Sequence, residues 1–201
     1  MQRILSHILV YALSFSLVCP VPALAAGITP DPSSGSKRPS MDAAANGVPV
    51  VNIVKPNASG LSHNQYKDFN VGKQGAILNN AAKPVNTQLG GIVAGNANLN
   101  GGPGARVILN EVTSSNRSHI QGYIEVGGRK ADVILANPNG ITINGGGFIN
   151  TGNAMLTTGK PQIANGTFTG VEVRQGDVRI EGAGINAANT DAFSILTIPP
   201  N

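Results

Sequence analysis

The sequence contains no tryptophan, a single cysteine and few aromatic or charged residues: 4% of its 201 residues are aromatic and 12% are charged. The one cysteine, Cys19, lies in an apolar N-terminal stretch, so the rest of the chain contains no disulfide. Such a chain must be held together by backbone pairing and apolar burial alone. Only two histidines, His63 and His119, follow that stretch, which argues against a zinc site and leaves no metal or cofactor implied.

Charge of either sign is sparse along the chain. The formal net charge is +4, and the basic residues are scattered, with Lys37-Arg38 and Arg129-Lys130 as adjacent pairs after the N-terminal stretch. A nucleic-acid or anionic-membrane partner calls for a dense basic cluster. The sequence therefore predicts no nucleic-acid partner.

Glycine and asparagine are abundant instead. All 26 glycines and 22 asparagines lie after residue 25. Both residue types disfavour helix, and the runs between them are short and rich in β-branched residues. The sequence predicts an all-β protein made of many short strands joined by tight turns.

The chain divides into four predicted segments. Residues 1–25 have the apolar run of a secretory signal peptide, and Ala23 and Ala25 supply the small residues of its cleavage site, which implies the Sec machinery as a partner. Residues 26–46 are rich in Pro, Ser and Gly and are predicted to be a flexible leader. The β domain is expected over 47–197, and 198–201 is a short tail.

Short apolar segments recur along the predicted domain. Strands are expected at 48–54, 76–78, 92–94, 106–112, 123–126, 132–136, 141–143, 148–149, 155–157, 167–169, 171–173, 178–180 and 193–197. From about residue 132 the strand starts are seven to twelve residues apart, with Gly or Asn in each gap. This spacing suits the faces of a β-solenoid, in which asparagines of successive turns stack. A β-sandwich uses similar spacing, but the lack of tryptophan favours the solenoid.

One segment departs from that rhythm. Residues 123–126 and 131–136 flank Gly127-Gly128-Arg129-Lys130, which has the length and glycine content of a hairpin loop. We predict a local antiparallel hairpin at this point.

Residues that could carry catalysis are few. His63 and His119 lie in polar stretches with no nucleophile elbow nearby, and we interpret them as surface or turn residues. The acids that come closest to a group are Glu172, Asp177 and Glu181. Arg174 and Arg179 alternate with these acids, which is typical of paired surface charges. A β-helical polysaccharide lyase or hydrolase is therefore a distant alternative, and no catalytic residue is assigned.

The most distinctive local pattern is Asn137-Pro138-Asn139-Gly140, between an apolar strand and Ile141-Thr142-Ile143. Asn137 can close an Asx-turn, Pro138 presets φ, and Asn139-Gly140 tolerate left-handed geometry. On these grounds alone the segment is a rigid turn. A related pattern, Asn96-Ala97-Asn98-Leu99, lies upstream.

Together with neighbouring residues, these turns carry a family resemblance. The match runs from about Val48 to Thr169 and includes Asn57-x-x-Gly60-x-Ser62-x-Asn64, Phe69-Asn70-Val71, Gly75-x-Ile77-Leu78-Asn79-Asn80, and Gly122-Tyr123-Ile124-Glu125-Val126 followed by 131–141. The sequence resembles the secretion domain of two-partner-secretion exoproteins, the filamentous-haemagglutinin and contact-dependent-inhibition family. The resemblance implies a right-handed parallel β-helix with an N-terminal cap and a small antiparallel sheet beside it.

The resemblance also implies a function. It predicts export from the periplasm through an outer-membrane barrel transporter with polypeptide-transport-associated (POTRA) domains, to the cell surface or the medium. Asn137, Pro138, Asn139 and Gly140 match the family's second motif in full. The first motif, normally Asn-Pro-Asn-Leu, has Ala97 at the proline position, between Asn96 and Asn98-Leu99. Both motifs are candidate transporter-recognition or structural turns.

Two further expectations remain open at this stage. Because family exoproteins are usually far longer, this chain is expected to be either a truncated product or a minimal secreted unit. A carbohydrate-binding adhesin, with surface glycans as partners, is the alternative function. Few aromatic residues are available to stack on a sugar, which ranks it below secretion.

Overall fold

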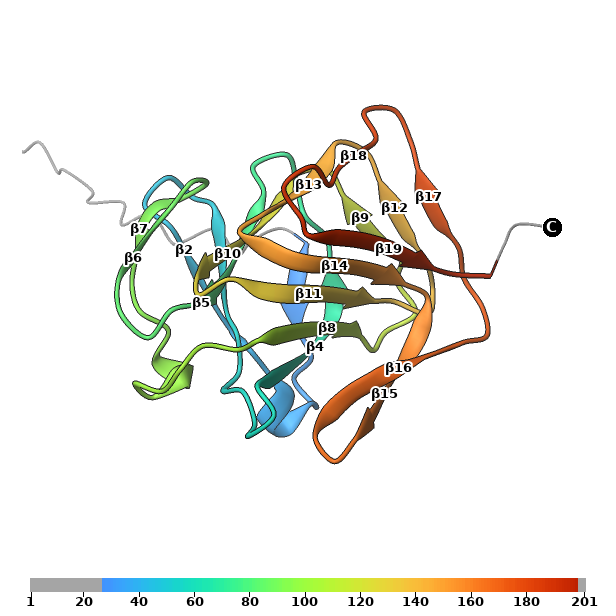
Figure 1. Ribbon diagram of the computed structural model, residues 1–201. Coiled ribbons are helices and arrows are strands. Elements are labelled where there is room, and N and C mark those ends of the chain that lie inside the picture. The colour runs from blue at the N-terminus through green and yellow to red at the C-terminus, as the bar shows by residue number, and fades with distance from the viewer. Residues whose placement is uncertain (1–26, 199–201) are drawn as a thin grey trace, which may run out of the picture.

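The computed structural model describes residues 27–198, which form strands joined by turns (Figure 1). Two short 3-10 turns, η1 (Gly35–Lys37) and η2 (Ala97–Leu99), are the only helical elements of this part of the chain. No helix within 27–198 is long and apolar enough to cross a membrane. The predicted signal peptide and its cleavage residues, Ala23 and Ala25, lie outside the described residues.

Most strands belong to three sheets, which we call sheets A, B and C; the core lies between them. Sheet A contains β1 (Ile28–Pro30), β4 (Leu61–Phe69), β8 (Val107–Val112), β11 (Ala131–Ala136), β14 (Thr151–Thr157) and β19 (Ala192–Leu196). Sheet B contains β2 (Ser40–Ala43), β3 (Pro49–Asn52), β5 (Ala76–Asn80), β10 (Tyr123–Gly128), β13 (Gly146–Ile149) and β18 (Ile185–Asn186). Sheet C contains β9 (Ser118–Ile120), β12 (Ile141–Ile143) and β17 (Val178–Ile180).

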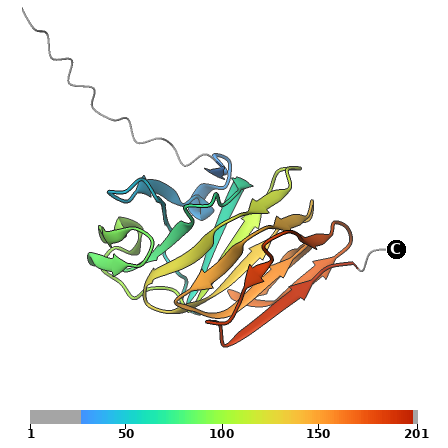
Figure 2. The same ribbon diagram turned by 90° about the horizontal axis from the view of Figure 1, so that it is seen from above.

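The chain visits these sheets in a repeating order. From β8 onward it runs repeatedly through sheet A, sheet C and sheet B, and successive strands of each sheet pair in parallel. Figure 2 shows the strands of successive coils stacked side by side. This arrangement confirms the predicted parallel β-helix.

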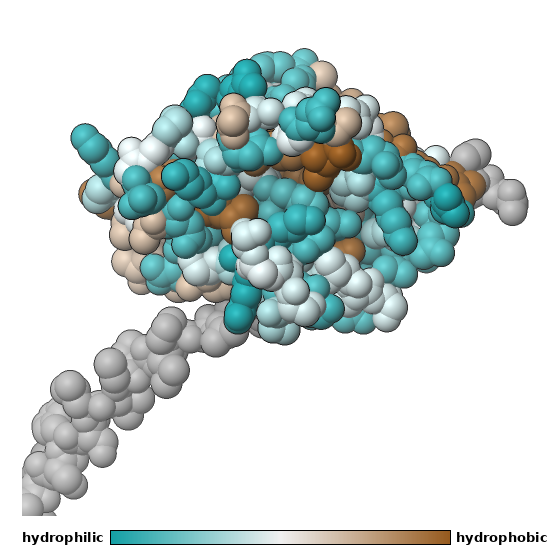
Figure 3. Space-filling model, turned by 90° about the horizontal axis from the view of Figure 1, so that it is seen from below, coloured by the Kyte–Doolittle hydropathy of each residue, from teal (hydrophilic) through white to brown (hydrophobic). Residues whose placement is uncertain are grey.

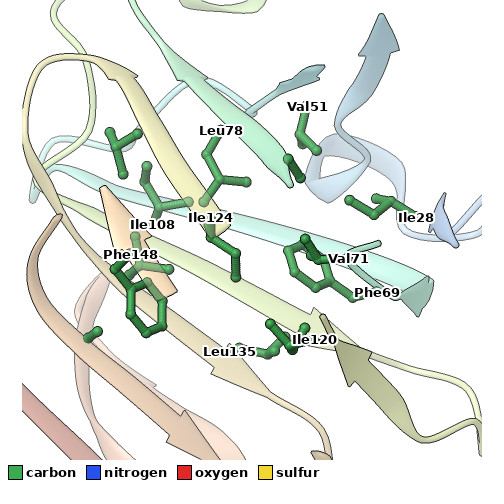
Figure 4. Packing of buried hydrophobic residues seen from close by; sticks show 14 of the residues in the cluster. Ile28, Val51, Phe69, Val71, Leu78, Ile108, Ile120, Ile124, Leu135 and Phe148 are labelled. Atoms are coloured by element: carbon green, nitrogen blue, oxygen red, sulfur yellow. The ribbon is translucent and has the colours of Figure 1, made fainter. Parts of the chain in front are cut away.

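The core is a narrow apolar column between the three sheets (Figure 4). On sheet A, Val133 is in register with Ile108 of the previous coil and Ala154 of the next. On sheet B, Ile124 is in register with Ala76 and Phe148. All six side chains are buried, and complete burial of a large apolar side chain stabilises a fold by about 1.5–3 kcal/mol.

The N-terminal end of the column is closed by strands that run the other way. β1 pairs antiparallel with β4, and β2 pairs antiparallel with β3. Ile28 packs in the core with Tyr66 and Phe69, whose rings meet edge to face at 5.0 Å. The resemblance to secretion domains implied such a cap, but the flexible leader predicted over 26–46 is wrong for residues 27–46. Its Pro, Ser and Gly residues lie both within β1, η1 and β2 and in the turns between them.

Asp31 fastens this cap to the first coils. Its carboxylate accepts hydrogen bonds from the backbone and hydroxyl of Ser33 and from the hydroxyl of Thr113, and Lys67 Nζ lies 3.1 Å away. The Ser33 and Thr113 hydroxyls hold the pKa of Asp31 well below its usual range. Asp31 is 3% exposed, so these contacts join the cap to β4 and to the segment after β8.

The antiparallel hairpin predicted over 123–136 is wrong. β10 belongs to sheet B and β11 to sheet A, and each has parallel neighbours from the adjacent coils. Gly128, with φ of 93°, and the two residues after it turn the chain around a corner of the helix. A short glycine-rich link between two apolar strands is compatible with a hairpin and with a corner of a β-helix. In a hairpin the two strands pair with each other, whereas here each strand pairs with strands of the adjacent coils.

Two antiparallel hairpins lie beside the helix, in agreement with the small extra-helical sheet that the resemblance implied. β6 (Val85–Thr87) pairs with β7 (Gly91–Val93), and β15 (Gly159–Ala164) pairs with β16 (Thr167–Val173). The buried Glu125 carboxylate accepts the backbone N–H groups of Gln88 and Leu89 at 2.7 and 2.8 Å, which holds the first hairpin. Phe168 of the second hairpin packs on an apolar cluster on sheet A.

β4 is the longest strand, yet it was not among the predicted strands. It buries Ser62 and Asn64 together with Tyr66 and Phe69, so its apolar alternation is interrupted. Burial raises the pKa of Tyr66 well above its usual value, and its hydroxyl donates to Asn110 Oδ1 at 2.9 Å. Ser62 donates to the Val54 carbonyl and Asn64 to the Leu109 carbonyl, and buried polar residues of this kind hide a strand from pattern analysis.

The contacts of Asp31 predict a pH-dependent contribution to stability. A folded-state pKa below that of the unfolded chain means that the carboxylate stabilises the fold above about pH 4 and that this contribution is lost as the pH falls further. We expect Asp31→Asn to lower the free energy of unfolding at pH 7, and the gap from wild type to shrink below pH about 4. Denaturant unfolding across pH tests this, with the exposed Asp42→Asn as control; a gap that stays constant contradicts the assignment.

Candidate functional site

The downstream motif forms the corner between β11 and β12. The Gly140 N–H donates to the Asn137 carbonyl at 3.0 Å, which closes a β-turn across Asn137-Pro138-Asn139-Gly140. The Asn139 N–H donates to Asn137 Oδ1 at 2.9 Å, so Asn137 also closes an Asx-turn. The turn predicted from the residue types is present.

The side-chain amides of this turn reach the previous coil. Asn137 Nδ2 donates to the Asn116 carbonyl and to Ser118 Oγ, both at 2.9 Å. Asn139 Nδ2 donates to the Ser114 carbonyl at 2.7 Å. Asn137 is fully buried, so the turn meets the hydrogen-bonding needs of the corner below it as well as its own.

Arg117 connects the same turn to the coil above. Its guanidinium donates to Asp177 Oδ1 at 2.6 Å, to Thr142 Oγ1 at 2.7 Å and to the backbone carbonyls of Ile141 and Asp177. Hydrogen bonds from Arg117 and then Arg179 hold the pKa of Asp177 below its usual range. Sequence reasoning did not assign Arg117, because its partners lie 24 to 60 residues away.

Gly140 is required by this contact. Its φ is +102°, and a Cβ at this position would lie 2.3 Å from Arg117 Nη1 and 2.9 Å from the Asp177 carbonyl oxygen. The backbone conformation and the packing of the guanidinium therefore both select glycine.

The upstream motif repeats the local geometry of the downstream one. The Asn98 N–H donates to Asn96 Oδ1 at 2.9 Å, the same distance as in the other Asx-turn. Ala97 to Leu99 form the short 3-10 turn η2, and Leu99 is fully buried in the core.

The amides of this upstream turn also bind other segments. Asn96 Nδ2 donates to the carbonyls of Ile53 and Asn79, both at 2.9 Å. Asn98 Nδ2 donates to the Asn52 carbonyl at 2.9 Å and to Ser40 Oγ at 3.1 Å. The turn thus ties the ends of β3 and β5 to the cap strand β2.

The two motifs occupy different corners. The upstream turn binds the ends of sheet B strands, and the downstream turn joins sheet A to sheet C. Within residues 27–198 they share no hydrogen-bond partner. The two motifs are therefore separate Asx-turns with similar local geometry, and they do not form one combined surface.

Other corner asparagines do the same work and were not assigned from the sequence. Asn80 Nδ2 donates to the carbonyls of Ala105 and Arg129, and Asn150 Nδ2 donates to those of Val126 and Gly128. The expected stacking of one asparagine on another occurs where Asn79 Nδ2 donates to Asn52 Oδ1 at 2.8 Å. An asparagine directly after an apolar strand is the sequence signal that could have identified Asn80 and Asn150.

Two of the three acids considered for catalysis are paired with arginines. Glu172 pairs with Arg174, and Asp177 pairs with both Arg117 and Arg179. Across the described range 27–198, no group of three or more His, Cys, Asp or Glu side chains is placed to hold a metal ion. These pairings argue against the lyase or hydrolase alternative.

The two histidines lie on different sheets. His63 Nε2 is 2.7 Å from Glu111 Oε2 on the neighbouring strand, and His119 is exposed on sheet C. Burial raises the pKa of Glu111, but hydrogen bonds from His63 and Gln65 outweigh it and leave that pKa below its usual value. No hydroxyl or thiol is hydrogen-bonded to either imidazole within residues 27–198.

A capped parallel β-helix fastened by Asn-x-Asn turns defines the class of this protein, and comparisons with known proteins identify the family. Residues 26–199 match the family model of the TPS secretion domain. The chain belongs to this family of two-partner-secretion domains, which confirms the resemblance found in the sequence.

The relatives are much longer proteins. The chain is 56% identical over 198 residues to the 16S rRNA endonuclease CdiA of Enterobacter cloacae, and 50% identical over 198 residues to a tRNA nuclease CdiA of Yersinia mollaretii. Each match covers 98% of this chain but only 6% of the relative. The nuclease activities in those names belong to proteins of which this chain spans a small part.

A solved structure supports the same assignment. The filamentous hemagglutinin secretion domain matches with a TM-score of 0.77 and 39% identity, covering 85% of this chain and 55% of that one. The chain is thus a secretion domain of CdiA- and filamentous-haemagglutinin-type exoproteins, which are secreted and surface-exposed. Membership implies an outer-membrane partner transporter.

The geometry of the upstream turn predicts that a proline is accepted at position 97. Asn96 has φ of −73° and ψ of 108°, the extended conformation that a residue before proline prefers, and a 3-10 residue has φ near that of proline. We expect Ala97→Pro to raise the free energy of unfolding by about 0.4–1 kcal/mol, because it restricts the unfolded chain. Denaturant unfolding measures this; a loss of stability would show that the turn needs the Ala97 N–H.

The contact of Gly140 with Arg117 predicts a large cost for a methyl group. We expect Gly140→Ala to lower the free energy of unfolding by about 2–4 kcal/mol, since it combines a strained φ with displacement of the guanidinium. Gly91→Ala is the matched control, because Gly91 also has a positive φ, of +66°, but its Cβ would meet nothing within 4 Å. Equal losses in the two variants would contradict the role of Arg117.

Proposed function

We propose that this domain is carried to the periplasm by the Sec machinery, engages the POTRA domains of its outer-membrane transporter before it has folded, and folds outside the cell. The observation that carries the proposal is the complete use of the motif amides in the folded domain. Asn137 is fully buried and Asn96 is 1% exposed, and both donate to groups in other segments. A transporter can contact these amides only while the chain is unfolded.

The hydrogen bonds of the two turns also suggest an order of folding, from the N-terminal cap toward the later coils. The upstream turn joins residues of the cap and first strands, so these can assemble before the later coils. Each later coil then adds to a strand edge that is already formed, as in other solenoids. Folding at the surface thereby favours outward movement without a nucleotide cofactor.

On this proposal the domain is the signal that the transporter recognises and the nucleus from which folding starts, and it has no catalytic role of its own. A glycan-binding adhesin that stacks sugars on aromatic rings has little support, because Tyr66, Phe69 and Phe148 are buried in the core. The remaining aromatics of the mature chain, Tyr123, Phe168 and Phe193, are only partly exposed.

Export with and without the cognate barrel tests the proposal. We expect wild-type chain in the medium only when the barrel is present, and a drop of about tenfold or more for Asn96→Ala/Asn137→Ala, since two buried hydrogen-bond networks of about 1–3 kcal/mol each are lost. Deletion of residues 136–140 should abolish export.

Asn86→Ala/Asn189→Ala, which changes two exposed asparagines, is the matched control and should be exported like wild type. Equal periplasmic accumulation with and without the barrel would contradict the transport function. Normal export of the Asn96/Asn137 variant and of the deletion would contradict only the role of the turns.

A further inference from the structure

Two adjoining hollows lie beside the start of β4. Their volumes are about 410 and 190 Å³, and they share Lys55 and Asn57. The larger hollow is bounded by η1 and by β15 of the outer hairpin, at the lower edge of the molecule in Figure 1. Seen from below, the molecule is largely hydrophilic, with a few small apolar patches (Figure 3).

Four cationic side chains from four separate segments line these hollows. Lys37 comes from η1, Lys55 follows β3, Arg106 precedes β8 and Arg129 lies at the corner between β10 and β11. All four are exposed. They are far apart in the sequence, and stacking of the coils brings them together. We call this set, with the two hollows, the basic groove.

The two arginines of the basic groove are oriented by the backbone. Arg106 Nη2 donates to the Ser59 carbonyl at 2.6 Å, and Arg129 Nη1 donates to the Gly104 carbonyl at 3.1 Å. Each bond anchors one terminal nitrogen of a guanidinium, and the other N–H groups donate to no protein group within residues 27–198. A planar, pre-oriented guanidinium is suited to bidentate binding of a phosphate.

Within residues 27–198 these cations make no direct contact with a carboxylate, although the charge of Lys37 helps to lower the pKa of nearby Glu111. None of the four forms an ion pair within residues 27–198, whereas Lys67, Lys130 and Arg174 do. The carboxylate beside the groove, Glu111, is bound by His63 and Gln65. The groove therefore retains positive charge that a bound anion could neutralise.

The lining also restricts the class of ligand. Among the described residues that bound the two hollows there is no Phe, Tyr or Trp, and the His63 imidazole is hydrogen-bonded to Glu111, so a neutral sugar has little stacking surface. Cations around two contiguous hollows suit a chain that carries more than one anionic group. Polar side chains such as Ser36 and Asn57 can bind hydroxyl groups between them.

We propose that the basic groove binds a phosphate-bearing saccharide, namely the phosphorylated inner core of lipopolysaccharide. The family's exoproteins are surface-exposed, and the relatives come from bacteria with an outer membrane, so this is the anionic saccharide nearest to a domain that has just crossed it. Binding there would retain the folded domain at the cell surface. This inference goes beyond export and does not depend on the asparagine turns.

Titration of the purified secreted chain with phosphorylated inner-core oligosaccharide tests the proposal. We expect saturable binding that weakens with salt, and an affinity about tenfold lower for Lys55→Gln/Arg106→Gln, because two charge-assisted contacts are lost. Lys73→Gln/Lys83→Gln removes the same charge from exposed sites outside the groove and should bind within about twofold of wild type. Circular dichroism on all variants checks that the exposed substitutions leave the fold intact.

Three results would overturn the assignment. Equal binding by the Lys55/Arg106 variant would place the ligand elsewhere. An equal loss of affinity in the Lys73/Lys83 control would show that binding depends on net charge and not on the basic groove. Binding of the dephosphorylated oligosaccharide, or of a sulfated glycosaminoglycan, as tight as that of the phosphorylated core would refute the ligand class. Because binding is measured on secreted protein, failure here leaves the export proposal standing.

Discussion

A parallel β-helix must turn its chain sharply at each corner of every coil, and a turn exposes backbone carbonyls that no strand pairs. In this domain, asparagine amides satisfy many of them. Asn96, Asn137 and Asn139 each donate from one corner to a carbonyl of another segment, as do Asn80 and Asn150. A buried polar group left unpaired destabilises the fold by about 1–3 kcal/mol. This set of hydrogen bonds removes that penalty at the corners where the coils stack.

The two family motifs gain a physical meaning from this constraint. Each is an Asx-turn whose first asparagine accepts a bond within the turn and donates two outside it. Ala97 can replace proline because the asparagines, not the ring, make the contacts between segments. Gly140 cannot be replaced so easily, because Arg117 lies across it and joins the turn to Asp177 of the next coil.

Local pattern was sufficient where a segment is apolar and short. The strands at 141–143 and 178–180 were predicted with the bounds that β12 and β17 have. It failed for β4, whose buried Ser62 and Asn64 find partners only through the fold. It also failed over 123–136, because a glycine-rich link is compatible with a hairpin and with a corner. The flexible leader predicted over 26–46 is wrong for residues 27–46 because β1 and β2 form only by pairing with β4 and β3.

Residue types and their spacing are enough to predict the all-β class, the regular recurrence of short strands, the two asparagine turns and, through these turns, the family. Composition and turn chemistry are local properties, so they can be recognised in one sequence without a structure. The folded coils are needed to show which carbonyls the amides bind and that Arg117 binds the downstream turn. They also bring together the four cations of the basic groove, Lys37, Lys55, Arg106 and Arg129. These depend on the register between coils, which is set by pairing between residues tens of positions apart and has no local signature.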